Sequence, residues 1–366
     1  MCKKVIMVIS VLLLMCRAAV ADDFLTLTDS QILDFTERSY SMSLPQSDGS
    51  CYIMGTGLQL QTENWFAHVS KDGTIDWTIS CPDSHFYRGA VQVNDTAYLI
   101  IDEYGMPVEQ RKPYLLPISA NGVQGDPIAL PAWMSDATIM RVDAGILVYS
   151  HNVSPLKVAL LDTSFRTLWS LETTKVPRNF YLTDACASYE NGYVLLAFNQ
   201  NERENALLFI DEGGEYAKTQ VLRDEGAGIA IVAEQDAFHI LIARRGMDTS
   251  VSYDLLTTDH NGICKTKKTI LSNSPDVTFN TLLLCKQGYL LGGSRANDTT
   301  QPKALLAFTP FAGEKLQIQD IPEITALEAC QFYMDTDHAI MVLGSHTGES
   351  GTADGRIICN WYLLNH

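Results

Sequence analysis

The chain lacks the short motifs by which many enzymes are identified from sequence. It has no His-Glu-x-x-His zinc motif, no phosphate-binding P-loop and no Gly-x-Gly-x-x-Gly dinucleotide fingerprint. The stretch His346–Gly351 (HTGESG) does not have the spacing of the Gly-x-Ser-x-Gly elbow of serine hydrolases. We therefore expect no cofactor, and no catalytic residue is identified by a motif.

Cysteines at metal-binding spacing are also absent. The nine cysteines include no Cys-x-x-Cys pair and no tight cluster, so no metal site is expected. Asp335–His338 brings oxygen ligands together but lacks the glycine and distal glutamate of a calcium loop. Most cysteines lie in apolar segments, which favours buried thiols, and one or more disulfides is the alternative.

Long apolar runs and basic residues are scarce. Beyond the N-terminus no stretch reaches the ~18 apolar residues of a membrane helix. The chain has 26 Lys and Arg against 43 Asp and Glu, a net charge of −17, which disfavours nucleic acid and anionic membranes. A protein, peptide or carbohydrate is the expected partner, with no nucleic acid and no integral membrane segment; the oligomeric state stays open.

The N-terminus has the features of a secretory signal. Lys3 and Lys4 precede the apolar run Val5–Met15, and Ala19–Ala21 offers a small-residue cleavage site. A lipoprotein signal ending at Cys16 is disfavoured, because Met15 is large where a small residue is needed. Residues 1–21 are therefore predicted to be a signal peptide, and the protein to be secreted or extracytoplasmic.

What the chain does contain is a repeated β-hairpin. In WFAHVSKDGTIDWTIS (65–80) apolar and polar residues alternate on both sides of a turn at Gly73. Similar hairpins turn near these positions: Gly122, Phe165, Gly213, Gly262 and Gly313. The spacing is about 43 to 51 residues, and two further strand-like segments precede each hairpin, so each unit has four strands.

This repeat predicts an all-β fold, a seven-bladed β-propeller of four-stranded antiparallel blades. No linker-like segment divides residues 22–366, which we interpret as one domain. The last unit ends with Arg356–Leu364 and has no fourth strand, so an N-terminal strand at Phe24–Thr28 is expected to complete the last blade. Ser41–Leu44 would begin the first blade. A short amphipathic helix at Asp29–Ser39 is the alternative for the segment between them.

Two hairpins resemble a known repeat. KDGTIDW and DTSFRTLW are similar to PQQ-like units, in which a turn is followed by tryptophan in the outer strand, and the blades as a whole resemble WD40-like repeats. Only Trp77 and Trp169 keep that tryptophan. The resemblance implies the propeller architecture and no narrower family.

In propellers, ligands usually bind at the loops around the mouth of the central channel, and this analogy gives the candidate site. These loops and the adjoining strand ends carry arginines, histidines and carboxylates that suit a polar or anionic ligand, with Arg pairing to a carboxylate. The candidate ligand-binding residues are Arg88, Asp102, His151, Asp184, Arg244, Arg245, Arg295 and His346. The alternative for Arg244 and Arg245 is a salt-bridged pair on the outer face.

The leading functional hypothesis is a secreted scaffold that binds a ligand or protein through this loop face. A glycan-active hydrolase or lyase is the alternative, with acid and base among Asp102, Asp136, Asp184, His151 and His346. A glycosidase would need two carboxylates within roughly 5 to 10 Å of one another. A cell-surface assembly protein is the second alternative.

Overall fold

The computed structural model describes residues 25–33, 38–46, 50–57, 64–81, 85–103, 106–107, 110–153, 155–176, 179–188, 192–297, 300–311, 315–325, 331–334, 339–347 and 353–364. Phe24, the predicted signal peptide, the Asp335–His338 segment and the predicted turn at Gly313 lie outside these residues.

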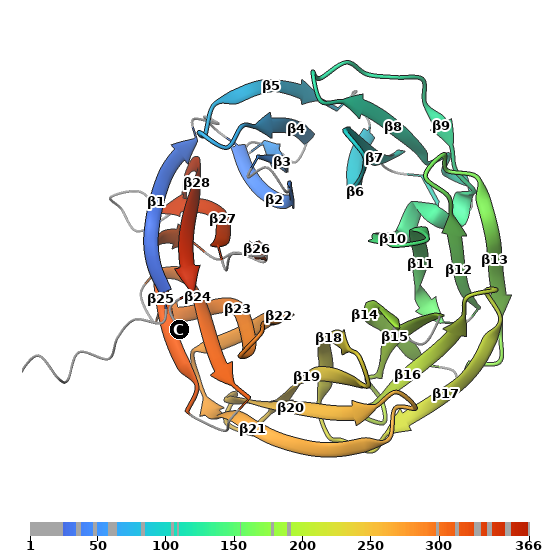
Figure 1. The fold of residues 1–366 in the computed structure, drawn as a ribbon, viewed down its shortest axis with the longest axis vertical. Helices are drawn as coiled ribbons and strands as arrows, with labels where there is room; N and C mark the ends of the chain where they lie inside the picture. Colours follow the sequence, from blue (N-terminus) through green and yellow to red (C-terminus); the bar gives the residue numbers. More distant parts are fainter. Residues whose placement is uncertain are drawn as a thin grey trace, which may run out of the picture.

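Six groups of four consecutive antiparallel strands are arranged around a central axis as the blades of a propeller (Figure 1). Blade one comprises β2 (Arg38–Pro45), β3 (Cys51–Gly57), β4 (Asn64–Val69) and β5 (Ile75–Ser80). Blade two comprises β6 (His85–Val93), β7 (Thr96–Glu103), β8 (Tyr114–Ser119) and β9 (Ile128–Ala129). The 3-10 helix η3 (Ala132–Asp136) leads to blade three, which comprises β10 (Ala137–Val142), β11 (Gly145–Val153), β12 (Leu156–Leu161) and β13 (Thr167–Thr173).

Blade four comprises β14 (Phe180–Ser188), β15 (Gly192–Asn199), β16 (Glu204–Asp211) and β17 (Tyr216–Leu222). Blade five comprises β18 (Ala227–Glu234), β19 (Ala237–Arg245), β20 (Val251–Asp259) and β21 (Cys264–Ser274). Blade six comprises β22 (Val277–Leu284), β23 (Gly288–Asn297), β24 (Thr300–Pro310) and β25 (Gln317–Thr325). In every blade the first strand lies nearest the centre of the ring and the fourth lies on the perimeter (Figure 1).

The count of seven separate blades is corrected to six. The last strands are β26 (Gln331–Met334), β27 (Ala339–Thr347) and β28 (Ala353–Leu364). Within the described residues this last part of the chain supplies three strands of its own and not four. β27 pairs with β28 and also with β25, at Ile324↔His346, in the sheet that contains blade six. The innermost of them, β26, has only four residues and pairs with β27 alone. A separate seventh blade completed by an N-terminal strand is therefore not established.

The N-terminal segment forms strand β1 (Leu25–Leu33), which pairs antiparallel with β28 from Leu25↔Leu364 to Leu33↔Ile357. The alternative of a helix over Asp29–Ser39 is wrong, because residues 29–33 and 38–39 are in strands. Leu33 packs with Ile357 and with Trp65 of blade one, so the two ends of the chain contact the same apolar cluster. β2 also contacts β26, β27 and β28.

Four of the predicted hairpin turns are confirmed by their backbone geometry. Gly73, Gly122, Phe165 and Gly262 have φ angles of 78°, 77°, 61° and 80°, the left-handed region that favours glycine. In the blade-four turn the left-handed residue is Gly214, with φ of 82°, rather than the predicted Gly213. The reason is hydrogen bonding, because the N–H of Gly214 closes the turn onto the carbonyl of Asp211 at 3.0 Å.

These turns also join neighbouring blades. A Cβ on Gly122 would lie 2.7 Å from the indole of Trp77 in the preceding blade, and one on Gly214 would lie 2.4 Å from that of Trp169. The Trp77 indole N–H also donates to the carbonyl of Ala120 at 2.8 Å. The tryptophans that follow two of the hairpin turns are therefore contacts between blades, and glycine lets the next turn approach them closely.

Five cysteines in the described part of the chain are free thiols. Cys51, Cys186 and Cys285 are buried, Cys81 is half-buried and Cys264 is exposed. Burial raises the pKa of the Cys51 thiol to about 12, which keeps it protonated and unreactive at neutral pH. For these five cysteines the prediction of unpaired thiols is confirmed, and the disulfide alternative does not apply.

Candidate functional site

Strand register brings most of the predicted residues to one edge of the ring. His85 at the start of β6 faces Glu103 at the end of β7, and Val277 of β22 faces Arg295 of β23. The beginnings of first strands and the ends of second strands therefore share an edge, which we call the loop face. The opposite edge carries the turns between first and second and between third and fourth strands, and we call it the turn face.

Asp102 is at the centre of an ion-pair cluster on the loop face. Its side chain is fully buried, and Oδ2 lies 3.2 Å from Nη1 of Arg111 and 3.9 Å from Nε of Arg88. Its Oδ1 accepts the N–H of Glu103 at 2.8 Å. The Arg88 guanidinium also lies 4.6 Å above the ring of Phe86. Asp102 is therefore paired with arginines inside the blade and is not exposed to a ligand.

Arg244 belongs to a second ion-pair cluster around a buried carboxylate. Its guanidinium donates to both oxygens of the fully buried Asp254, at 2.5 and 3.0 Å. Thr269 and Lys267 reach the same carboxylate at 2.7 and 3.2 Å. Burial alone would raise the pKa of Asp254, but the hydrogen bonds from Arg244, Thr269 and Lys267 outweigh it and hold the pKa below its usual range.

Arg295 is likewise paired. Its Nη1 donates to Asp320 at 2.9 Å, and its Nε lies 3.5 Å from Asp276. The sequence left open a salt-bridged pair for Arg244 and Arg245. The structure has ion pairs for Arg244 and Arg295, and none for Arg245 among the residues described.

Asp184 connects blades four and five. One carboxylate oxygen accepts the N–H of Ala185 and the other accepts the N–H of Ile231 on β18, both at 2.8 Å. Burial raises the pKa of Asp184 to about 6, against the opposing effect of these two hydrogen bonds. Both oxygens are thus engaged with backbone donors.

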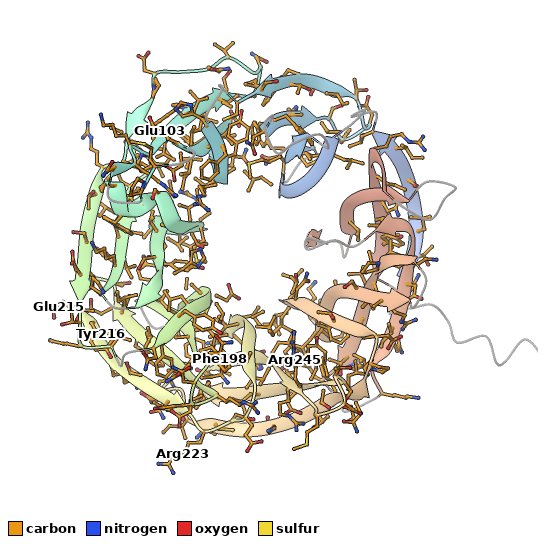
Figure 2. All side chains as sticks on the ribbon, turned by 180° about the vertical axis from the view of Figure 1, so that it is seen from behind. Glu103, Phe198, Glu215, Tyr216, Arg223 and Arg245 are labelled. Atoms are coloured by element: carbon orange, nitrogen blue, oxygen red, sulfur yellow. The ribbon has the colours of Figure 1, made fainter. Side chains whose placement is uncertain are left out.

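Three exposed side chains on blades three to five take part in no ion pair with the residues described. Within the described ranges no ion pair joins His151, Tyr181 or Arg245 to another residue. The Nε2 of His151 lies 3.2 Å from the hydroxyl of Thr138, and Tyr181, with 36% of its surface exposed, packs edge-on against Phe198. His151 is adjacent to Asn152, which pairs with Tyr181 across β11 and β14. Figure 2 shows Phe198 and Arg245 toward the inner side of the ring, whereas Arg223 lies on its perimeter.

The acid and base residues of the enzyme alternative are separated by the fold. Asp102 belongs to blade two and Asp184 to blade four, and each is held by the partners given above. The side chains of Asp136 and His346 lie outside the described residues. Among the side chains that the structure describes, no three His, Cys, Asp or Glu groups converge in a way that would hold a metal ion.

Sequence reasoning missed a cavity of about 810 Å³ on the turn face. Its walls come from β10, β12, β14, β15 and β18 and from the turn after β16. The signal in the sequence is the acidic pair Asp143 and Glu212, which lie in turns on the face opposite the predicted binding loops.

No family model and no curated protein sequence matches the chain. Among solved structures, Drosophila Semaphorin 2a is similar with a TM-score of 0.55 at 8% identity, over 92% of this chain and 76% of that one. The chain has a β-propeller fold. The likeness to this propeller, at such low identity, shows the fold alone.

Two other solved structures are more weakly similar. The WD40 domain of SCAP from fission yeast has a TM-score of 0.49 at 7% identity, over 92% of this chain and 98% of that one. A puromycin hydrolase has a TM-score of 0.49 at 11% identity, over 87% of this chain and 52% of that one. Neither likeness carries an argument about function. Among the residues described, no helix of this propeller is long and apolar enough to cross a membrane.

Proposed function

We propose that this propeller is an exported, non-enzymatic scaffold that binds a peptide or carbohydrate ligand through the loop face of blades three to five. The observation that carries the proposal is the contrast among the arginines. Arg88, Arg244 and Arg295 are occupied by buried or neighbouring carboxylates, whereas Arg245 is exposed and has no ion-pair partner within the described residues.

The neighbouring groups favour a ligand that has both a carboxylate and a flat or apolar surface. A guanidinium donates two parallel hydrogen bonds to a carboxylate, and an exposed tyrosine ring packs against a sugar or an apolar side chain. Arg245, Tyr181 and His151 supply these groups from adjacent blades. A sugar acid or a peptide carboxylate therefore fits this set better than a neutral or cationic ligand.

A glycan and peptide array with the purified protein tests the proposal, followed by titration of the hits against variants. We expect Arg245→Ala and His151→Ala each to weaken binding by about 5- to 30-fold, because each removes a hydrogen-bond donor or a charge. Arg223→Ala is the matched control, since it removes the same charge from the perimeter. Undiminished binding in both loop-face variants would reject the site.

Export is part of the proposal and rests on the sequence of residues 1–21. Expression of the full chain in a host with a secretory pathway, with N-terminal sequencing of the product, tests it. The expected mature N-terminus is Asp22. A product that is retained with Met1 intact would contradict export.

We also propose that β1 closes the ring by covering the outer edge of β28. Supporting this are the antiparallel pairing of the two strands and the packing of Leu33 against Ile357 and blade one. An uncovered strand edge promotes aggregation. A chain that begins after Leu33 should therefore aggregate or lose stability, and a truncated protein as soluble and stable as the full one would refute closure.

A further inference from the structure

The turn-face cavity is built from three successive blades. Its lining residues are Met140, Val142, Asp143, Ala144, Leu160, Ala185, Cys186, Ala187, Ser188, Gly192, Tyr193, Glu212, Ile231, Val232 and Ala233. Its volume of about 810 Å³ lies within the range of pockets that hold small organic ligands. It lies at the opposite end of the strands from His151 and Arg245.

The charge of the cavity has one sign. Asp143, in the turn between β10 and β11, and Glu212, after β16, are its only ionised groups among the lining residues described. Both carboxylates act on the phenol of Tyr193, whose pKa is raised first by burial and then by the negative charges of Glu212 and Asp143. Asp143, Tyr193 and Glu212 all line this one cavity. Neither is joined to a lysine or arginine by an ion pair in the described part of the chain.

The lining of the cavity is mixed, and part of it is apolar. Val142, Leu160, Ala185 and Ile231 are buried side chains that line it, and Tyr193 adds an aromatic ring. A cavity lined in part by apolar side chains and by two carboxylates is complementary to a molecule with a hydrophobic body and a positive head. In a chain with a net charge of −17, the long-range field also favours the approach of a cation.

We propose that this cavity binds an organic cation, an ammonium or guanidinium group attached to an apolar body, with Asp143 and Glu212 holding the charge and Tyr193 contacting the body. The site does not depend on the loop-face proposal, because the two share no residue. The cation could belong to a free amine or to a lysine side chain of a peptide, and the experiment below distinguishes these sources.

Isothermal titration with three probes tests the proposal: benzylammonium, benzyl alcohol as its neutral counterpart, and an acetylated, amidated tripeptide with a central lysine. We expect benzylammonium to bind saturably and benzyl alcohol to bind at least about tenfold more weakly, since the carboxylates would contribute only to the cation. Tighter binding of the tripeptide than of benzylammonium identifies a peptide side chain as the source. The reverse order identifies a free amine.

Paired variants then locate the binding. Asp143→Asn with Glu212→Gln should weaken benzylammonium binding by about tenfold, the combined effect of two exposed charge interactions. Glu215→Gln with Asp236→Asn is the matched control, because it removes the same charge from turn-face positions outside the cavity; Figure 2 shows Glu215 on the perimeter. The control should change the affinity by less than about twofold.

Three results would overturn the site: no saturable binding of either cation by the native protein, equal affinity for benzyl alcohol, or equal losses in the two double variants. Thermal denaturation of each variant checks its fold. If the cavity double variant does not fold, the single substitutions Asp143→Asn and Glu212→Gln are measured, and each should cost about threefold in affinity. Two single variants with native affinity would likewise reject the proposal.

Discussion

Gly214→Ala should destabilise the propeller because Gly214 lies where blade four meets blade three. An alanine there would have a φ near 82° and a Cβ 2.4 Å from Cδ2 of the Trp169 indole. The left-handed conformation costs a non-glycine residue about 1 kcal/mol, and displacing a packed side chain costs about 1 to 3 kcal/mol. We therefore expect a loss of about 3 kcal/mol in the free energy of unfolding, and a decrease in Tm of roughly 4 °C for a domain of this size.

Gly213→Ala is the matched control in the same turn. Gly213 does not have a positive φ, and the nearest atom to its added Cβ is a carboxylate oxygen of Asp211 at 3.4 Å, which is an ordinary contact. Its effect should stay within about 0.5 kcal/mol. Calorimetry or circular dichroism is the assay, because neither depends on tryptophan fluorescence.

A double-mutant cycle separates the steric contribution from the backbone strain. When Trp169→Ala is combined with Gly214→Ala, the collision disappears and only the cost of the positive φ remains for the glycine site. The combined loss should then be smaller than the sum of the single losses by about 1 to 3 kcal/mol. Additive losses, or a Gly213→Ala variant as unstable as Gly214→Ala, would refute the proposed contact between the blades.

Three further predictions concern single contacts. Trp77→Phe should destabilise by about 1 kcal/mol more than Trp169→Phe, because the Trp77 indole N–H has a carbonyl acceptor whereas that of Trp169 has no partner within the described residues; thermal unfolding compares them. The pKa of Asp184 rises from 3.8 to about 6 on folding, so its ionisation makes folding less favourable as the pH rises through that window. The free energy of unfolding of Asp184→Asn should therefore increase, relative to that of the native protein, by up to about 3 kcal/mol between pH 4 and pH 7. A difference that does not change with pH would contradict this. Leu33→Asp should cost about 3 kcal/mol or more because Leu33 is 2% exposed, whereas Ile32→Asp, at a site 46% exposed on the same strand, should cost little by urea denaturation.

The repeat could be predicted from the sequence because its signals are local. Hairpin turns need a left-handed residue at a fixed place, and alternation within about six residues marks each strand. At Gly213 and Gly214 two glycines are adjacent, so residue type does not tell which one adopts the left-handed conformation. The hydrogen bond from the N–H of Gly214 to the carbonyl of Asp211 closes the turn at the second glycine. The blade count failed because it assumed that the last unit and an N-terminal strand would make a separate four-stranded blade. In the described residues the innermost strand of that unit, β26, has only four residues, and β27 pairs with β25 as well as with β28.

The candidate site could be predicted only as a location. Alternation along β19 implies that Arg244 and Arg245 point to opposite faces of the sheet. Which of these faces has a buried carboxylate for an arginine to bind depends on the neighbouring strand. That acid is Asp254 on β20, which lies opposite Ile242 in the register, and Lys267 comes from β21. The pairing of three strands, with three register shifts between β20 and β21, decides which of the two arginines has a carboxylate partner, and no pattern in the sequence encodes this combination.

The distribution of paired and unpaired charges makes the two ends of the strands chemically different. On the loop face the acids Asp102 and Asp254 are buried beneath arginines, so Arg245 is left as an exposed positive charge. On the turn face Asp143 and Glu212 line a cavity and have no basic partner among the described residues.

An anion should therefore compete with loop-face ligands and leave benzylammonium binding unaffected, and a cation should do the reverse. Because both charged sites are open to solvent, raising the salt from about 0.05 to 0.5 M should weaken both kinds of binding. If one ligand displaced both probes, the two sites would not be independent and the separation of the faces would be wrong.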